Sequence, residues 1–362
     1  MTNFVNSAGH TFASARLAAL FRHHDSQHAD RRRQRQSDQV SKMEPLSRII
    51  LMVLALLALA RAASAQQSAP YPVPDGISFR KATIWSEGTR MAAEVFVPAS
   101  EQKLPTIIMA HGWGGTAALL REDAVAFAKA GYLVVTFDYR GWGESDARVI
   151  LTAPEPAERP GNRFSAEVTE LREIVDPLAE AADWFNAIHW VQGEPQSDTR
   201  RLGLWGSSFA GGLVVYVAGY DRRVKAVHSQ VGPLDLRGAA ALATGIGYDE
   251  ATRRARGTLG YPKPGEIVVG NLRGAPIRDH FFSYSPADAI SLAPDCAVQI
   301  VLAGHEELFD NRTAVIDAYD RFKGTKKRLI VIPNITHYGI YGVARAEAQK
   351  LAVEWFDQHL KP

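Results

Sequence analysis

The stretch Leu-Gly-Leu-Trp-Gly-Ser-Ser-Phe-Ala-Gly-Gly, residues 202–212, decides how the chain is interpreted. An apolar run leads to Gly206, and Ser208 follows two residues later. Small residues come next, and a second apolar run begins at Leu213. This pattern predicts a strand, a very tight turn and a helix, with the middle residue strained and its side chain clear of the sheet. Because the N–H groups at a helix start favour a developing negative charge, the turn is suited to present an activated serine.

The segment resembles the nucleophile elbow of the α/β-hydrolase superfamily, Gly-x-Ser-x-Gly. The last glycine of that pattern is Ala210 here, which is nearly as small. Ser207 is the alternative nucleophile, but it falls one position early in the pattern and is expected to point back into the sheet. Taken alone, the motif leaves a Gly/Ser turn without chemistry as a serious alternative, so the other motifs decide the question.

Strand-like and helix-like segments alternate along the chain. Apolar runs that are expected to be strands lie at 77–84, 91–97, 106–110, 132–137, 201–205, 224–231, 297–303 and 328–332, the first two forming a hairpin. Since most of these runs are apolar throughout, they predict an α/β fold whose doubly wound, mostly parallel sheet has helices on both faces. The resemblance implies the α/β-hydrolase fold over residues 77–362. Residues 235–285 show no clear strand and are expected to form a small inserted cap, and 146–163 a Pro-rich loop.

A histidine after the last strand is the expected base for Ser208. A serine hydroxyl is a poor nucleophile until a base takes its proton. His337 lies in the loop 333–339, directly after the run 328–332. The resemblance implies the chain order serine, acid, histidine, and His337 satisfies it. The alternative for His337 is a surface-loop residue without a catalytic role.

The acid that orients His337 is expected after the run 297–303, because polar residues that follow parallel strands meet at one edge of the sheet. Glu306 is the preferred residue, and its spacing matches one of the patterns in which the family usually has Asp. Glu307, Asp310 and Asp235 remain open as alternatives. Asp310 has a structural alternative as the cap of the helix that follows it.

Two backbone N–H groups are expected to stabilise the oxyanion that attack on a carbonyl creates. They belong to Phe209, directly after the nucleophile, and to Trp113 in the loop His-Gly-Trp-Gly-Gly, residues 111–115. The alternative for this loop is a tight strand-to-helix turn. No Gly-Lys-Ser/Thr follows it and the dinucleotide pattern Gly-x-Gly-x-x-Gly is absent, so a phosphate or nucleotide cofactor is not expected. Candidates for a pocket wall are Trp142, Phe209, Phe281, Phe282 and Tyr284, although aromatic residues more often belong to a core.

The first 65 residues differ in composition from the rest. Residues 43–65 contain a basic residue, an apolar run and an Ala-x-Ala ending, which predict a secretory signal peptide cleaved after Ala65. The run is shorter than the roughly 20 residues that a membrane-spanning helix needs. We therefore expect residues 1–42 to be a mis-called or disordered extension and 66–76 a flexible lead-in. The mature protein is expected in the periplasm or secreted, without stable membrane insertion.

Composition excludes several other classes. After residue 65, acidic side chains slightly outnumber basic ones, so nucleic-acid binding is not expected. The single cysteine, Cys296, excludes an internal disulfide and a cysteine-built metal site, and no metal or other cofactor is expected.

Within the superfamily, the chain resembles the dienelactone-hydrolase-like and X-Pro-dipeptidyl-peptidase-like branches. True dienelactone hydrolases use a cysteine nucleophile, so Ser208 argues against that activity. The sequence therefore predicts an exported serine hydrolase that cleaves small carboxylic esters through an acyl-enzyme. A peptidase or amidase that acts on short peptides is the alternative with the same site, and a non-catalytic binding protein of this fold is the alternative of another class.

Overall fold

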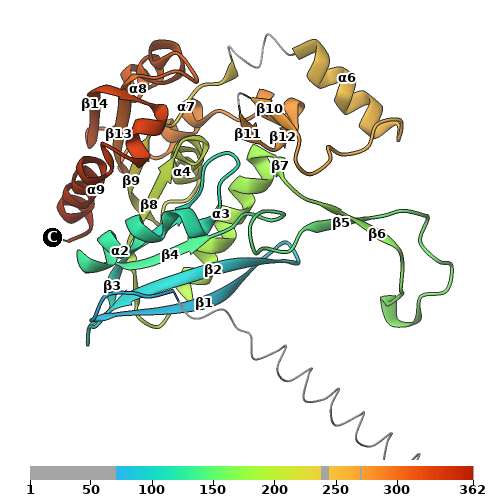
Figure 1. Cartoon of the computed structure of the whole chain (residues 1–362), viewed down its shortest axis with the longest axis horizontal. Coiled ribbons are helices and arrows are strands. Elements are labelled where there is room, and N and C mark those ends of the chain that lie inside the picture. The colour runs from blue at the N-terminus through green and yellow to red at the C-terminus, as the bar shows by residue number, and fades with distance from the viewer. Residues whose placement is uncertain (1–70, 238–243, 270, 362) are drawn as a thin grey trace, which may run out of the picture. The chain divides into compact units, whose positions relative to one another are not determined.

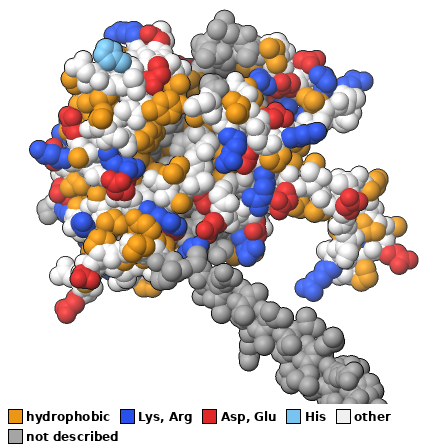
Figure 2. All heavy atoms as spheres, in the orientation of Figure 1, with side chains coloured by type: hydrophobic (Ala, Val, Ile, Leu, Met, Phe, Trp, Pro, Cys, Tyr) orange, Lys and Arg blue, Asp and Glu red, His pale blue; other side chains and the backbone are white. Residues whose placement is uncertain are grey.

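The computed structural model describes residues 71–237, 244–269 and 271–361 (Figure 1). The predicted extension 1–42 and signal peptide 43–65 lie outside these ranges, as does the first part of the predicted lead-in. Within the described ranges, none of the helices combines the length and the apolar character that a bilayer crossing requires. Figure 2 shows basic and acidic side chains intermingled over the face that it presents.

An eight-stranded sheet lies at the centre of the described chain, in the order β1-β2-β4-β3-β8-β9-β13-β14. The strands are β1 (Ile77–Ser86), β2 (Thr89–Pro98), β3 (Leu104–Ala110), β4 (Leu133–Phe137), β8 (Ser197–Ser207), β9 (Val224–Gln230), β13 (Ala297–His305) and β14 (Lys327–Thr336). The pairs β1–β2 and β2–β4 are antiparallel, and the other neighbours pair parallel. The structure thus confirms the predicted hairpin and the mostly parallel sheet.

Helices cover both faces of this sheet (Figure 1). They are η1 (Ala117–Leu120), α2 (Arg121–Lys129), α3 (Pro177–Gln192), α4 (Phe209–Tyr220), η5 (Arg312–Ile316), α8 (Asp317–Arg321), η6 (His337–Tyr341) and α9 (Arg345–Leu360). Strand β3 shows why both faces are covered, since Ile108 and Ala110 belong to a core cluster with α3 and α4, whereas Ile107 and Met109 belong to one with α2 and α9. All four side chains are fully buried, as the continuous apolar run predicts.

Two insertions interrupt the sheet order. The first holds β5 (Arg148–Leu151), η2 (Pro160–Asn162), β6 (Val168–Leu171) and β7 (Ile174–Val175). The second holds α6 (Thr244–Ala255), β10 (Ile267–Val269), β11 (Leu272–Arg273), β12 (Ala275–Pro276), η3 (Arg278–Phe282), α7 (Pro286–Ala289) and η4 (Ile290–Leu292). The segment 235–285 therefore contains three short strands where the sequence indicated none, and 146–163 contributes a strand of a hairpin rather than a plain loop. Because β12 pairs with β7, the two insertions are joined by backbone hydrogen bonds.

Two histidines are buried close to the sheet and are uncharged. His228 on β9 is fully buried, and burial lowers its pKa to about 3. His111, which follows β3, is 3% exposed, and burial lowers its pKa to about 4. Both values lie below the ordinary histidine pKa of about 6.5, so the unfolded chain binds more protons than the folded one in mild acid.

The two histidines should therefore destabilise the fold as the pH falls below about 6.5, each by about 1.4 kcal/mol per pH unit until its own folded-state pKa is reached. Buried carboxyl groups whose pKa is raised, Asp183 and Glu180, act in the opposite direction, so the histidine contribution is read from a variant. The slope of the free energy of unfolding against pH is measured with urea at pH 7, 6 and 5 in the wild type and in His228→Asn. His228→Asn should reduce the slope by about one histidine's share. An unchanged slope in that variant would show that His228 is not the group responsible.

Candidate active site

Ser208 lies in the turn between β8 and α4, in the strained conformation that the sequence predicts. Its backbone has φ 57° and ψ −130°, a combination that non-glycine residues rarely adopt. The turn needs small neighbours: a Cβ at Gly206 would run into the carbonyl of Ala210, and one at Gly211 would lie 2.8 Å from the Cα of Gly232. The small residues around Ser208 are thus explained by the tight packing of the turn that presents it.

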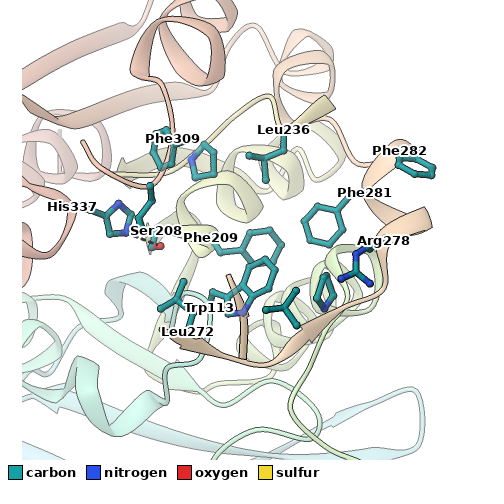
Figure 3. A pocket seen from close by; sticks show the side chains of 14 residues that line it. Trp113, Ser208, Phe209, Leu236, Leu272, Arg278, Phe281, Phe282, Phe309 and His337 are labelled. Carbon is teal, nitrogen blue, oxygen red and sulfur yellow. Dashed lines mark hydrogen bonds between the residues drawn. The ribbon is translucent and has the colours of Figure 1, made fainter. Parts of the chain in front are cut away.

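Ser208, His337 and Glu306 form one line of hydrogen bonds. The Oγ of Ser208 lies 2.9 Å from Nε2 of His337, and both carboxylate oxygens of Glu306 lie 2.9 Å from its Nδ1 (Figure 3 shows the serine and the imidazole facing each other). Because a carboxylate only accepts, Nδ1 carries the ring proton, and Nε2 is left to accept from the serine hydroxyl. The side chains of His337 and Glu306 are almost completely buried, at 2% and 1% exposure. This is the arrangement in which a base can take the serine proton.

The other candidate acids bind groups other than the imidazole ring of His337. Glu307 accepts the backbone N–H of His337 at 2.6 Å. Asp310 accepts the N–H and hydroxyl of Thr313 and so caps the following helix. Asp235 pairs with Arg237 and Arg321. Among these four carboxylates, Glu306 is the one hydrogen-bonded to the imidazole ring.

The neighbouring Ser207 is buried and turned away from His337. Its Oγ lies 2.7 Å from the hydroxyl of Tyr341. The structure thus presents Ser208, and not Ser207, to the imidazole, in agreement with the position of Ser208 in the motif.

The glycine-rich loop after β3 lies against the Ser208 turn. A Cβ on Gly112 would come within 2.8 Å of the Cβ of Ser208 and of the carbonyl oxygen of Ser207. Within the described residues, no hydrogen-bond acceptor is found for the backbone N–H of Trp113 or of Phe209. Two unpaired N–H groups beside a serine are what stabilisation of an oxyanion requires.

Comparisons with known proteins agree with this architecture. The model of the X-Pro dipeptidyl-peptidase family (S15) matches residues 87–253. An uncharacterized 31.7 kDa protein in the traX-finO intergenic region of Escherichia coli is 28% identical over 308 residues, 76% of this chain and 97% of that protein. The quorum-quenching protein AidA of Acinetobacter baumannii is 32% identical over 146 residues, 40% of this chain and 41% of AidA. The crystal structure of the α/β hydrolase GrgF from Penicillium sp. superimposes with a TM-score of 0.58 at 17% identity, covering 78% of this chain and 99% of GrgF.

The chain has the α/β-hydrolase fold. The resemblance seen in the sequence is confirmed, and the S15 match agrees with the expected branch of the superfamily.

Residues of the second insertion contribute to an apolar pocket of about 290 Å³ next to Ser208. It is lined by Trp113, Ser208, Phe209, Pro233, Leu236, Val268, Leu272, Pro276, Arg278, Phe281, Phe282, Leu308, Phe309 and His337. In Figure 3, Ser208 and His337 lie at one end and Arg278 at the other. Of the aromatic residues that the sequence offered as pocket walls, Phe209, Phe281 and Phe282 line the pocket, whereas Trp142 and Tyr284 are buried in the core.

A second hollow of about 300 Å³ also borders Ser208 and His337. It is more polar, and side chains that border it include Asp123, Ser207, Tyr338, Tyr341 and Arg345. Apart from Ser207, the alternative nucleophile of the motif, these residues belong to no pattern recognised in the sequence. Tyr341 in particular is not part of any recognised pattern, although it comes only four positions after His337.

The contact between Gly112 and the elbow predicts a sensitive position in this α/β-hydrolase. In Gly112→Ala the new methyl group must displace the loop or the elbow, because backbone atoms surround it. We expect the kcat of hydrolysis to fall about 100-fold or more, as it does when an oxyanion donor is lost. Gly193→Ala at the end of α3, where a Cβ meets only one atom at 3.5 Å, is the matched control and should keep full activity. Full activity in folded Gly112→Ala would contradict this placement of the loop.

Proposed function

We propose that this α/β-hydrolase cleaves carboxylic esters through a covalent acyl-enzyme. The observation that carries the proposal is the line of hydrogen bonds from Glu306 through His337 to Ser208, at the edge of an apolar pocket. The strained elbow presents the nucleophile, and the apolar pocket can bind the acyl group of an ester. Acyl transfer to a serine is the reaction that such a set of groups serves best.

The proposed reaction begins when Ser208 Oγ attacks the ester carbonyl and its proton passes to His337 Nε2. The carbonyl oxygen becomes an oxyanion, which the N–H groups of Trp113 and Phe209 stabilise. His337 then gives its proton to the alcohol oxygen as the C–O bond breaks. A water molecule, deprotonated by His337, attacks the acyl-enzyme, and Ser208 recovers its proton as the acid leaves. Glu306 stays ionised and stabilises the imidazolium.

A peptidase or amidase is the second candidate, and the match to the X-Pro dipeptidyl-peptidase family favours it. Such an enzyme must bind the ammonium group at the N-terminus of its peptide. The described residues that line the apolar pocket include no carboxylate, and the cation among them, Arg278, is already paired with Glu250 at 2.5 Å. An ammonium group would find no partner of opposite charge in this lining, so the pocket favours an apolar acyl group over a free peptide end.

The two functions are separated by the bond that the enzyme cleaves fastest. We expect the purified protein to hydrolyse p-nitrophenyl butyrate and to leave Gly-Pro-p-nitroanilide largely intact. Faster turnover of the anilide would replace the ester proposal by the peptidase. Failure on both, together with failure to hydrolyse a panel of other esters, would favour the non-catalytic binding protein.

A further inference from the structure

A line of buried polar side chains crosses the sheet toward the active site. It begins at Arg328 on β14, whose Nε lies 2.5 Å from Oε1 of Gln299 on β13. The amide nitrogen of Gln299 lies 2.7 Å from Nδ1 of His228 on β9. Gln299 and His228 are fully buried among apolar residues. Burial of such groups carries a large penalty unless they are paired, so their pairing is a specific feature of this core.

The line continues from β9 to Ser207, the last residue of β8. Nε2 of His228 lies 3.3 Å from Oε1 of Gln230, whose amide nitrogen donates to Ser207 Oγ at 3.2 Å. The hydroxyl of Ser207 in turn lies 2.7 Å from that of Tyr341. Ser207 and Gln230 are also buried, at 1% and 3% exposure. The path thus runs over four neighbouring strands of the parallel sheet, β14, β13, β9 and β8, and it ends at η6, the short helix that begins with His337.

Every hydrogen bond in this line points the same way, and Arg328 sets the direction. A guanidinium only donates, so the Gln299 oxygen faces it and the Gln299 amide donates to His228 Nδ1. The His228 proton is then on Nε2 and is donated to Gln230, which is consistent with a neutral ring.

The donors of the last two hydrogen bonds are assigned in the same way. Ser207 accepts from Gln230, so its own hydrogen goes to the oxygen of Tyr341. The Tyr341 hydrogen is therefore left to donate elsewhere, and aligned donors of this kind strengthen one another.

The side chain of Tyr341 lies beside the reaction centre. Tyr341 borders the second hollow together with Ser208 and His337. Its ring centre lies 6.4 Å from that of His337. Burial raises the pKa of Tyr341 to about 12, although the hydrogen bond from Ser207 opposes the shift, so the phenol keeps its proton at neutral pH.

We propose that Tyr341 is a further catalytic residue, which donates a hydrogen bond to the leaving-group oxygen and is held in that orientation by the line of side chains from Arg328. The inference rests on the proposed ester hydrolysis. The leaving oxygen must lie beside His337 Nε2, which protonates it, and Tyr341 is on the same short helix as His337. The N–H groups of Trp113 and Phe209 are needed for the other oxygen, that of the carbonyl.

Tyr341 keeps its proton throughout the proposed step. The bond between the acyl carbon and the leaving oxygen breaks, and the bonding pair goes to that oxygen. Its proton comes from His337 Nε2, while the Tyr341 hydrogen bond spreads the negative charge that develops before the proton arrives. Tyr341 therefore matters more for a poor leaving group, on which more charge must be stabilised, than for a good one.

The test compares two leaving groups on one acid. In Tyr341→Phe, kcat/KM for ethyl butyrate should fall about 10- to 100-fold, the effect of losing a hydrogen bond to a charged group. For p-nitrophenyl butyrate the fall should be less than about threefold, because this leaving group needs little help. The matched control is Tyr132→Phe, which removes another buried hydroxyl, bonded to Asp357 at 2.6 Å, and should leave both rates unchanged.

A structural role for Tyr341 would lower both rates equally, and that result, or no loss at all, would overturn the proposal. Ser207→Ala should shift the ratio of the two rates in the same direction by a smaller factor. An unshifted ratio would show that the line of side chains from Arg328 does not orient Tyr341. If the wild-type protein hydrolyses neither ester nor any other, the proposed function itself fails, which is a distinct outcome from a failure at Tyr341.

Discussion

Ser208→Ala should abolish nearly all ester hydrolysis, lowering kcat about 10⁴- to 10⁶-fold. Without the hydroxyl, no acyl-enzyme can form, and what remains is attack by water assisted by the N–H groups of the oxyanion site. KM should change little, because the apolar pocket that binds the acyl group is intact. The measurement is the hydrolysis rate of p-nitrophenyl butyrate at saturating and at low substrate concentration.

The control for this experiment is Ser78→Ala on β1, a serine that donates to the Val97 carbonyl at 3.2 Å on the antiparallel edge of the sheet. It should hydrolyse the ester at the wild-type rate. A loss below about tenfold in folded Ser208→Ala would mean that another group attacks the ester.

Glu306→Gln should lower kcat about 10³- to 10⁴-fold. The carboxylate accepts the Nδ1 proton of His337 with both oxygens at 2.9 Å, which fixes the tautomer that serves as base. An amide removes the charge that stabilises the imidazolium, and its NH₂ group can hold the ring in the wrong tautomer. The rate on p-nitrophenyl butyrate, with a thermal melt to show that the variant is folded, makes the measurement.

Glu307→Gln is the matched control, because it makes the same chemical change one position away. Its carboxylate binds the backbone N–H of His337, not the ring, so an amide oxygen can replace it. We expect a loss below about tenfold. If Glu307→Gln loses more activity than Glu306→Gln, the assignment of the acid is wrong.

The candidate site residues that the sequence predicts and the structure brings together share one property, which is that local geometry dictates the residue types around them. A strained turn tolerates only small neighbours, so Gly206 and Gly211 mark the position of Ser208. The chain order of a parallel sheet places residues after successive strands on one edge, which brings Glu306 and His337 together across 31 positions of sequence. Spacing alone left Glu307, Asp310 and Asp235 open, since the direction of each side chain depends on the folded loops.

Other features have no local signature. The strands β7 and β12 are two residues long, too short for a periodic pattern, and become visible only when distant segments pair. His228 and Gln230 lie inside an apolar strand, and nothing in their spacing shows that they hydrogen-bond in one direction toward Tyr341. Such pairings cross from strand to strand and depend on the register of the sheet, which sequence periodicity does not determine.

The central claim is that the imidazole of His337 activates the hydroxyl of Ser208. A fluorophosphonate reacts covalently with an activated serine, and intact-mass measurement followed by peptide mapping locates the adduct. We predict one adduct per chain, on Ser208 and not on Ser207, and its loss in His337→Ala. Absence of labelling in the folded wild-type protein, or an adduct on another serine, would contradict the account.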